Sequence, residues 1–163
     1  MTEAAAEQAR RDRVFLVVVD DSPERAVALR YAALRAAKSG GRVALLRVVE
    51  PVEQAEWAGI GAMMAQERLE EAESLLAGLA AQVKEITGGL PVLITREGKV
   101  ADELLELLAE DPRISILVLA TAADSKGPGP LVAALTGRLA AKMTIPMTVV
   151  PGTMSEAELD RVT

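Results

Sequence analysis

The chain has 163 residues, of which half are hydrophobic and only 2% aromatic, and its formal net charge is −6. Nucleic-acid binding relies on clustered Lys and Arg and on aromatic stacking, so this composition argues against it. Because the sequence contains no His and no Cys, we expect no imidazole catalysis, no thiol nucleophile and no His or Cys metal site.

The length fits one domain with one substantial core. The N-terminus is polar and lacks the apolar segment of a signal peptide, and no stretch is long and apolar enough to cross a membrane. We therefore expect a cytoplasmic protein that does not bind membranes. Its predicted parts are a flexible N-terminal segment at residues 1–12, one folded domain at 13–151 and a polar C-terminal tail at 152–163.

The first predicted strand is the β-branched run at residues 14–19, which is typical of a strand buried on both faces of a parallel sheet. It ends at Asp20 and Asp21. Ser22 is a good helix N-cap and Pro23 suits the first helical position, so a helix is predicted to follow as far as about Ser39.

The alternation of strand and helix continues along the chain. Further strands are predicted at residues 42–49, 91–95, 114–120 and 147–150, and further helices at 63–87, 101–110 and 131–143. Residues 52–62 form a predicted irregular connection, where we expect Trp57 to be a packing anchor or a dimer contact. This alternation predicts a single-domain α/β fold, an open five-stranded parallel sheet with helices on both faces.

A ligand crevice is expected beyond the carboxyl ends of the strands, where the strand order reverses. If the order is 3-2-1-4-5, the reversal falls between the first and fourth strands. It brings Val19, Asp20 and Asp21 next to Leu119 and the loop that follows it. The crevice is thus the predicted site of any ligand.

Five segments, in this order and spacing, resemble the universal stress protein (UspA) family: 17–22 (VVVDDS), 44–51 (ALLRVVEP), 96–105 (REGKVADELL), 116–120 (ILVLA) and 145–151 (IPMTVVP). The resemblance covers about residues 13–151. It implies a Rossmann-like, adenine nucleotide alpha hydrolase-like fold with the strand order 3-2-1-4-5. It also implies a homodimer through the last strand, formed by Met147, Thr148, Val149 and Val150.

One branch of that family binds ATP and the other does not. In the binding branch, the positions of Asp20 and Val48 lie at the adenine, and the phosphates lie on a motif of three glycines and one Ser or Thr. The matching positions here are Ala120, Ala123, Ala133 and Ala134, so the resemblance is to the branch that lacks the motif. A Cβ at a position that needs positive φ is strained, and it holds a phosphate off the backbone amides.

Other residues of the predicted site also depart from the pattern. The family usually has Gly in place of Asp21 and often His in place of Arg47. Pro128 and Pro130 lack N–H donors, and Asp124 adds negative charge. Should a nucleotide bind, the expected contacts are Val19, Asp20, Asp21, Val48, Leu119, Ala120, Ala123, Lys126, Gly127, Gly129, Ala133 and Ala134.

These features favour a binding or regulatory protein of the stress response, with unidentified protein partners, no cofactor and no catalytic residue. The alternative is an ATP-binding stress protein, even a slow ATPase, in which Lys126, Gly127 and Gly129 rebuild a phosphate site.

Three further possibilities are weaker on the residues alone. The pair Asp20 and Asp21 could hold Mg²⁺, but a turn that precedes the first helix is the simpler interpretation. Ser125 and Lys126 are adjacent in a loop and need not face one another as a catalytic pair. A phosphoacceptor receiver domain lacks its acceptor, because the third strand ends in Thr95-Arg96-Glu97 without an Asp.

Overall fold

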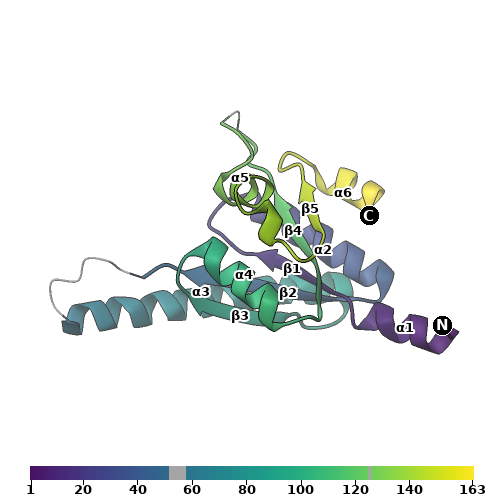
Figure 1. Cartoon of the computed structure of the whole chain (residues 1–163), viewed down its shortest axis with the longest axis horizontal. Coiled ribbons are helices and arrows are strands. Elements are labelled where there is room, and N and C mark those ends of the chain that lie inside the picture. The colour runs from purple at the N-terminus through teal and green to yellow at the C-terminus, as the bar shows by residue number, and fades with distance from the viewer. Residues whose placement is uncertain (52–57, 125) are drawn as a thin grey trace.

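Five strands pair in parallel in the order β3-β2-β1-β4-β5 in the computed structural model, which describes residues 1–51, 58–124 and 126–163 (Figure 1). The strands are β1 (Val14–Val18), β2 (Arg42–Val49), β3 (Val92–Glu97), β4 (Ile114–Ala120) and β5 (Met147–Val150). The predicted sheet and its order are confirmed. Because β1 pairs with both β2 and β4, the strand order reverses between β1 and β4.

The central strand β1 is buried on both faces, as its apolar run predicts. Phe15 and Val17 belong to one core cluster, and Leu16 and Val18 to the other. The first cluster is completed by residues of α2 (Arg25–Ser39), α3 (Ala58–Thr87) and α6 (Glu156–Val162). The second is completed by residues of α4 (Val100–Glu110) and α5 (Pro130–Thr136). Helices therefore cover both faces of the sheet.

Helix α2 begins later than its predicted cap requires. The Ser22 hydroxyl donates a hydrogen bond to Oδ1 of Asp20 at 2.7 Å, and the Ser22 amide bonds to the same oxygen at 3.0 Å. Ser22 is thus part of a turn, and the predicted Ser22 cap is wrong. The N-cap is Glu24, whose side chain makes no capping hydrogen bond, so its carboxylate is available to another segment.

Two other helices differ from their predicted bounds. Helix α5 ends at Thr136, because the backbone of Gly137 leaves the helical region (φ −106°, ψ −111°), and only a short 3₁₀ helix, η1 (Ala140–Lys142), follows. Helix α3 begins at Ala58, five positions before the predicted residue 63, and projects beyond the sheet at the left of Figure 1. Trp57 and Ser125 lie outside the described residues.

Both ends of the chain contain helices. Residues predicted as a flexible segment form α1 (Glu3–Arg11), an alanine-rich run in which Glu7 and Arg11 form an ion pair one turn apart. In the predicted polar tail, Ser155 and Glu158 form a reciprocal capping box at the start of α6. Leu159 of α6 is only 1% exposed and belongs to the core cluster that α2 completes.

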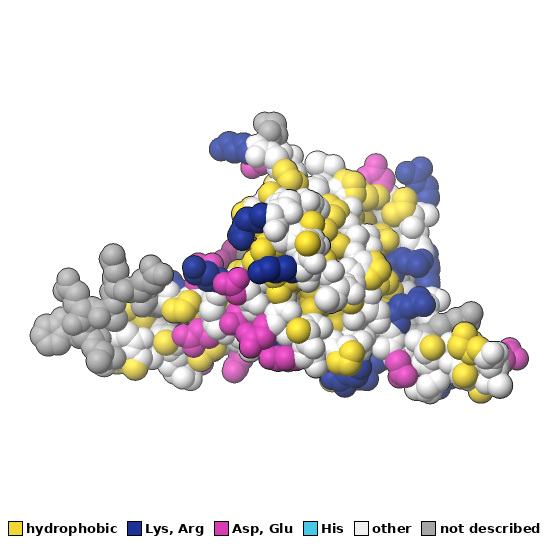
Figure 2. All heavy atoms as spheres, in the orientation of Figure 1, with side chains coloured by type: hydrophobic (Ala, Val, Ile, Leu, Met, Phe, Trp, Pro, Cys, Tyr) yellow, Lys and Arg dark blue, Asp and Glu magenta, His cyan; other side chains and the backbone are white. Residues whose placement is uncertain are grey.

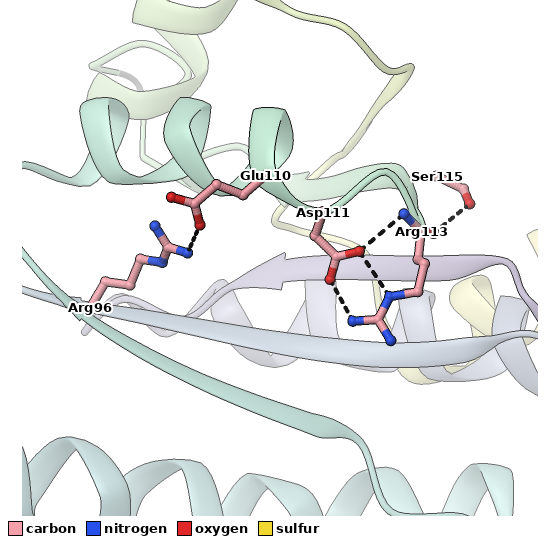
Figure 3. Close-up of polar contacts among 5 residues, drawn as sticks. All are labelled: Arg96, Glu110, Asp111, Arg113 and Ser115. Atoms are coloured by element: carbon pink, nitrogen blue, oxygen red, sulfur yellow. Dashed lines mark hydrogen bonds and ion pairs between the residues drawn. The ribbon is translucent and has the colours of Figure 1, made fainter.

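Polar contacts attach α4 to the sheet edge (Figure 3). The Arg96 guanidinium of β3 donates to the Glu110 carboxylate at the end of α4, and this hydrogen bond lowers the pKa of Glu110. In the turn between α4 and β4, Arg113 bonds to both carboxylate oxygens of Asp111, which lowers the pKa of that group. Acidic side chains gather over α4 in Figure 2.

Within the described residues, no helix combines the length and the apolar character needed to cross a membrane.

Candidate ligand crevice

A cavity of about 1010 Å³ lies at the carboxyl ends of β1, β2 and β4. The strand ends contribute Val18, Val19 and Asp20 from β1 and its end, Val48 from β2, and Leu119 and Ala120 from β4. The turn before α4 and the first residues of α5 complete the wall. This is the position where the strand order reverses, and the volume is at the upper end of the roughly 300–1,000 Å³ typical of small-molecule sites.

The structure brings part of the predicted nucleotide site into this cavity. Seven predicted residues line it, namely Val19, Asp20, Val48, Leu119, Ala120, Gly129 and Ala134. Asp21 lines a smaller cavity of about 510 Å³ beside it. Ala123, Lys126, Gly127 and Ala133 are not among the lining residues of either cavity, and all four are exposed. The predicted dimer residues, Met147 to Val150, form β5 at an edge of the sheet.

Charged side chains surround the cavity, and most of them are not among the predicted site residues. Five cations line it (Arg25, Arg47, Arg68, Lys99 and Arg138) against three acids (Asp20, Glu24 and Glu50). The lining charge, five minus three, is therefore +2, whereas the whole chain carries −6. Of these cations, only Arg47 stands at a position that the resemblance to the family singled out. The other four come from separate elements, so no sequence pattern groups them.

The two adjacent acids after β1 form a turn. Arg47 donates to the Val19 carbonyl at 3.1 Å and to Oδ1 of Asp21 at 2.9 Å, and the Asp21 side chain is 83% exposed. Arg25 donates to the Asp20 carbonyl at 2.8 Å. The Asp20 carboxylate accepts hydrogen bonds from Ser22 instead, so the two acids have different partners. Among the residues that the structure describes, no three His, Cys, Asp or Glu side chains are grouped to hold a metal ion.

Four amides of the loop after β4 donate hydrogen bonds inside the protein. Thr121 N donates to the Val150 carbonyl at 2.9 Å, and Ala122 N donates to the Pro128 carbonyl at 3.2 Å. Ala123 N donates to Oε1 of Glu24 at 2.9 Å, and Lys126 N donates to Oδ1 of Asp124 at 3.1 Å. A phosphate that approached these amides would have to break existing hydrogen bonds.

The backbone of this loop is not strained at its alanines. Positive φ values fall on Gly127 (105°) and Gly129 (98°), and no described residue other than glycine has one. The expected strain of alanine at a positive φ is therefore absent. The positive φ values of the loop fall instead on the two glycines that the sequence does contain.

Comparisons with known proteins agree with this architecture. A universal stress protein UspA from Lactobacillus plantarum has a TM-score of 0.68 at 18% identity, covering 86% of this chain and 98% of that one. A universal stress family protein from Burkholderia pseudomallei has a TM-score of 0.64 at 19% identity, covering 87% and 97%. A universal stress protein in complex with cAMP has a TM-score of 0.61 at 16% identity, covering 86% and 98%.

At these identities the structures are similar in fold alone. No curated protein sequence matches the chain. The sequence model described as the Universal stress protein family, however, matches residues 13–151, which is most of the chain. The chain therefore belongs to the universal stress protein family.

Proposed function

We propose that this chain is a binding or regulatory protein of the stress response that does not bind ATP in the usual way of its family. The observation that carries the proposal is the bonding of four loop amides, those of Thr121, Ala122, Ala123 and Lys126, inside the protein. Free backbone N–H groups bind oxyanions at such loops. An N–H that is already bonded must first break that hydrogen bond, so its bond to a phosphate adds little binding free energy.

The cavity suits a small ligand with an apolar part and one anionic group. Val18, Val48 and Leu119 supply apolar wall, and the lining carries a net positive charge. One structural relative is described as a complex with cAMP, a nucleotide with a single phosphate. Singly charged ligands of this kind are the first that we would screen against the chain.

A fluorescent ATP analogue tests the main proposal. We expect no saturable binding at micromolar concentration to the wild-type protein. Saturable binding that disappears in Asp20→Ala, but persists in the remote control Asp12→Ala, would contradict the proposal. Asp20 lines the cavity, whereas Asp12 lies in the exposed segment before β1.

The alternative, an ATP-binding protein with a remodelled loop, has one observation in its favour. The cavity is open, and Lys99 and Arg138 line it without an ion pair among the described residues. These cations could hold phosphates away from the loop after β4. If they do, ATP binding should weaken in Lys99→Ala and Arg138→Ala. The wild-type protein should also release phosphate from ATP faster than either of these variants.

We also propose a homodimer through β5. Its strand lies at the sheet edge, where unpaired backbone groups invite pairing, and Val149 is 36% exposed. Light scattering should give a dimeric mass at micromolar concentration. Val149→Lys should give a monomer, whereas Leu93→Lys, on the opposite edge strand β3, should remain dimeric. A monomeric wild-type protein would contradict the proposal.

A further inference from the structure

We propose that Glu24 determines the ligand specificity of the crevice, because its carboxylate occupies the Ala123 amide and excludes phosphate groups from the loop after β4. The inference rests on the proposed function, since it names the residue that withholds this loop from phosphates. A ligand of the crevice should then present a neutral or cationic group to Glu24, and place any anionic group elsewhere along the wall.

The contact between Glu24 and Ala123 joins two distant parts of the chain. Oε1 of Glu24 accepts a hydrogen bond from the Ala123 amide at 2.9 Å, across 99 positions of sequence. This hydrogen bond is the largest cause of a lowered pKa at Glu24, so the carboxylate is ionised at neutral pH. Glu24 is also one of the residues that line the cavity, so its negative charge lies at the cavity wall.

A glycine in a third segment makes room for the Glu24 side chain. A Cβ at Gly152 would lie 2.6 Å from Cγ of Glu24 and would collide with the Thr121 carbonyl oxygen. The Gly152 amide donates to the Thr121 hydroxyl oxygen at 3.2 Å, and the Thr121 amide donates to the Val150 carbonyl at 2.9 Å. We call Glu24, Thr121, Ala123 and Gly152 the Glu24 clamp. It ties together the start of α2 and the loops after β4 and β5.

The Glu24 clamp opposes a phosphate in two ways. It uses the donor that a phosphate oxygen would need, and it places a negative charge where the phosphate charge would lie. Asp124, in the same loop, accepts from the Lys126 amide and adds to the second effect. Ser22, in the β1–α2 turn, does not replace the lost donor, because its amide and its hydroxyl both donate to Asp20. Removal of the Glu24 carboxylate should therefore free one amide and raise the lining charge.

The test separates these two effects with matched variants and inorganic triphosphate as the probe. Glu24→Ala removes both the charge and the hydrogen bond. Glu50→Ala removes the same charge from the same cavity, but the Glu50 side chain makes no hydrogen bond among the described residues. Glu24→Gln removes the charge and keeps an oxygen that can accept from Ala123. Calorimetric titration of the full-length proteins gives the dissociation constants.

We expect triphosphate to bind Glu24→Ala at least about tenfold more tightly than the wild-type protein. Glu50→Ala and Glu24→Gln should each gain about threefold or less, since they change charge alone. Equal gains in Glu24→Ala and Glu50→Ala would overturn the inference, and so would a Glu24→Ala protein that binds no better than wild type.

Two further measurements keep the test decisive. If Glu24→Ala does not fold, Glu24→Ser replaces it, because Ser is a favourable N-cap for α2 and is too short to reach Ala123. Amide hydrogen exchange should show protection of Ala123 that is lost in both variants, and unchanged protection would overturn the inference. This gain is measured with triphosphate, whereas the proposed function is tested with a fluorescent ATP analogue, so the two proposals can fail separately.

Discussion

The two sides of the crevice differ in what their hydrogen-bonding groups do. On the side of β2 and α4, Lys99 lines open space and makes no ion pair within the described part of the chain. On the side of β4, the amides of Ala122 and Ala123 are already bonded to Pro128 and Glu24. Both sides lie where the fold places ligands. The difference teaches that position in the fold is not sufficient, because a site also needs unused donors.

The largest expected effect comes from a residue outside both sides. Leu159 is 1% exposed and packs in the cluster that α2 completes, so Leu159→Ala should lower the free energy of unfolding by about 2–5 kcal/mol. Urea denaturation measures this loss, with Leu90→Ala, at a position 68% exposed, as the control. Triphosphate affinity of the folded protein should not change. A loss equal to that of the control would show that α6 is not held by Leu159.

The second prediction converts the bonded side of the crevice into a free one. Glu24→Ala combined with Ala120→Gly, Ala123→Gly, Ala133→Gly and Ala134→Ser should raise ATP affinity about 100-fold, or about 2.7 kcal/mol. The glycines allow closer approach of a phosphate, and the loss of Glu24 frees the Ala123 amide. The same four Ala substitutions with Glu24 intact should gain much less. Similar affinities in both proteins would contradict the role of the carboxylate.

The third prediction disturbs the Glu24 clamp from outside the cavity lining. Gly152→Ala forces a Cβ against Glu24 and the Thr121 carbonyl, so it should cost about 1–3 kcal/mol of unfolding free energy. Thermal unfolding measures the loss, and hydrogen exchange at Ala123 should accelerate in the variant. Gly59→Ala, where a Cβ meets nothing within 4 Å, is the matched control. Unchanged stability in Gly152→Ala would mean that the loops move apart at no cost.

The smallest expected effect is a response to acid. The Ala123 hydrogen bond lowers the pKa of Glu24 in the folded protein, so the contact stabilises above the pKa of the unfolded chain and is lost as pH falls through the folded value. As the pH falls through the pKa of Glu24 in the folded protein, the Glu24 carboxyl and the Ala123 amide should titrate together in NMR spectra. In Glu24→Gln the Ala123 amide should no longer titrate. Separate midpoints in the wild-type protein would rule out the contact.

The sheet was predictable because local pattern decides it. The strands β2, β4 and β5 have their predicted bounds, since apolar β-branched runs between turn residues leave little choice. Helix ends were less predictable, because distant contacts decide them. The Ser22 hydroxyl bonds to Asp20 instead of capping α2, and Leu159 draws the predicted tail into the core.

The candidate site was predictable only where topology defines it. Asp20, Val48 and Leu119 line the cavity because they stand at strand ends, which the strand order brings together. The Glu24 clamp had no local signal, since Glu24 and Ala123 are 99 positions apart and Gly152 lies in a segment predicted as a polar tail. Contacts of this kind depend on which side chains the folded chain brings within hydrogen-bonding distance.

The two faces of β1 have a consequence for insertions and deletions. Both faces are apolar, so polarity alone would not penalise a shift of this strand by one residue. Side-chain volume provides the penalty instead. Phe15 belongs to the cluster in which α2 buries mainly alanines, whereas Leu16 faces the leucines of α4. A one-residue deletion in β1 would exchange these large and small partners, leaving voids on one face and overlaps on the other.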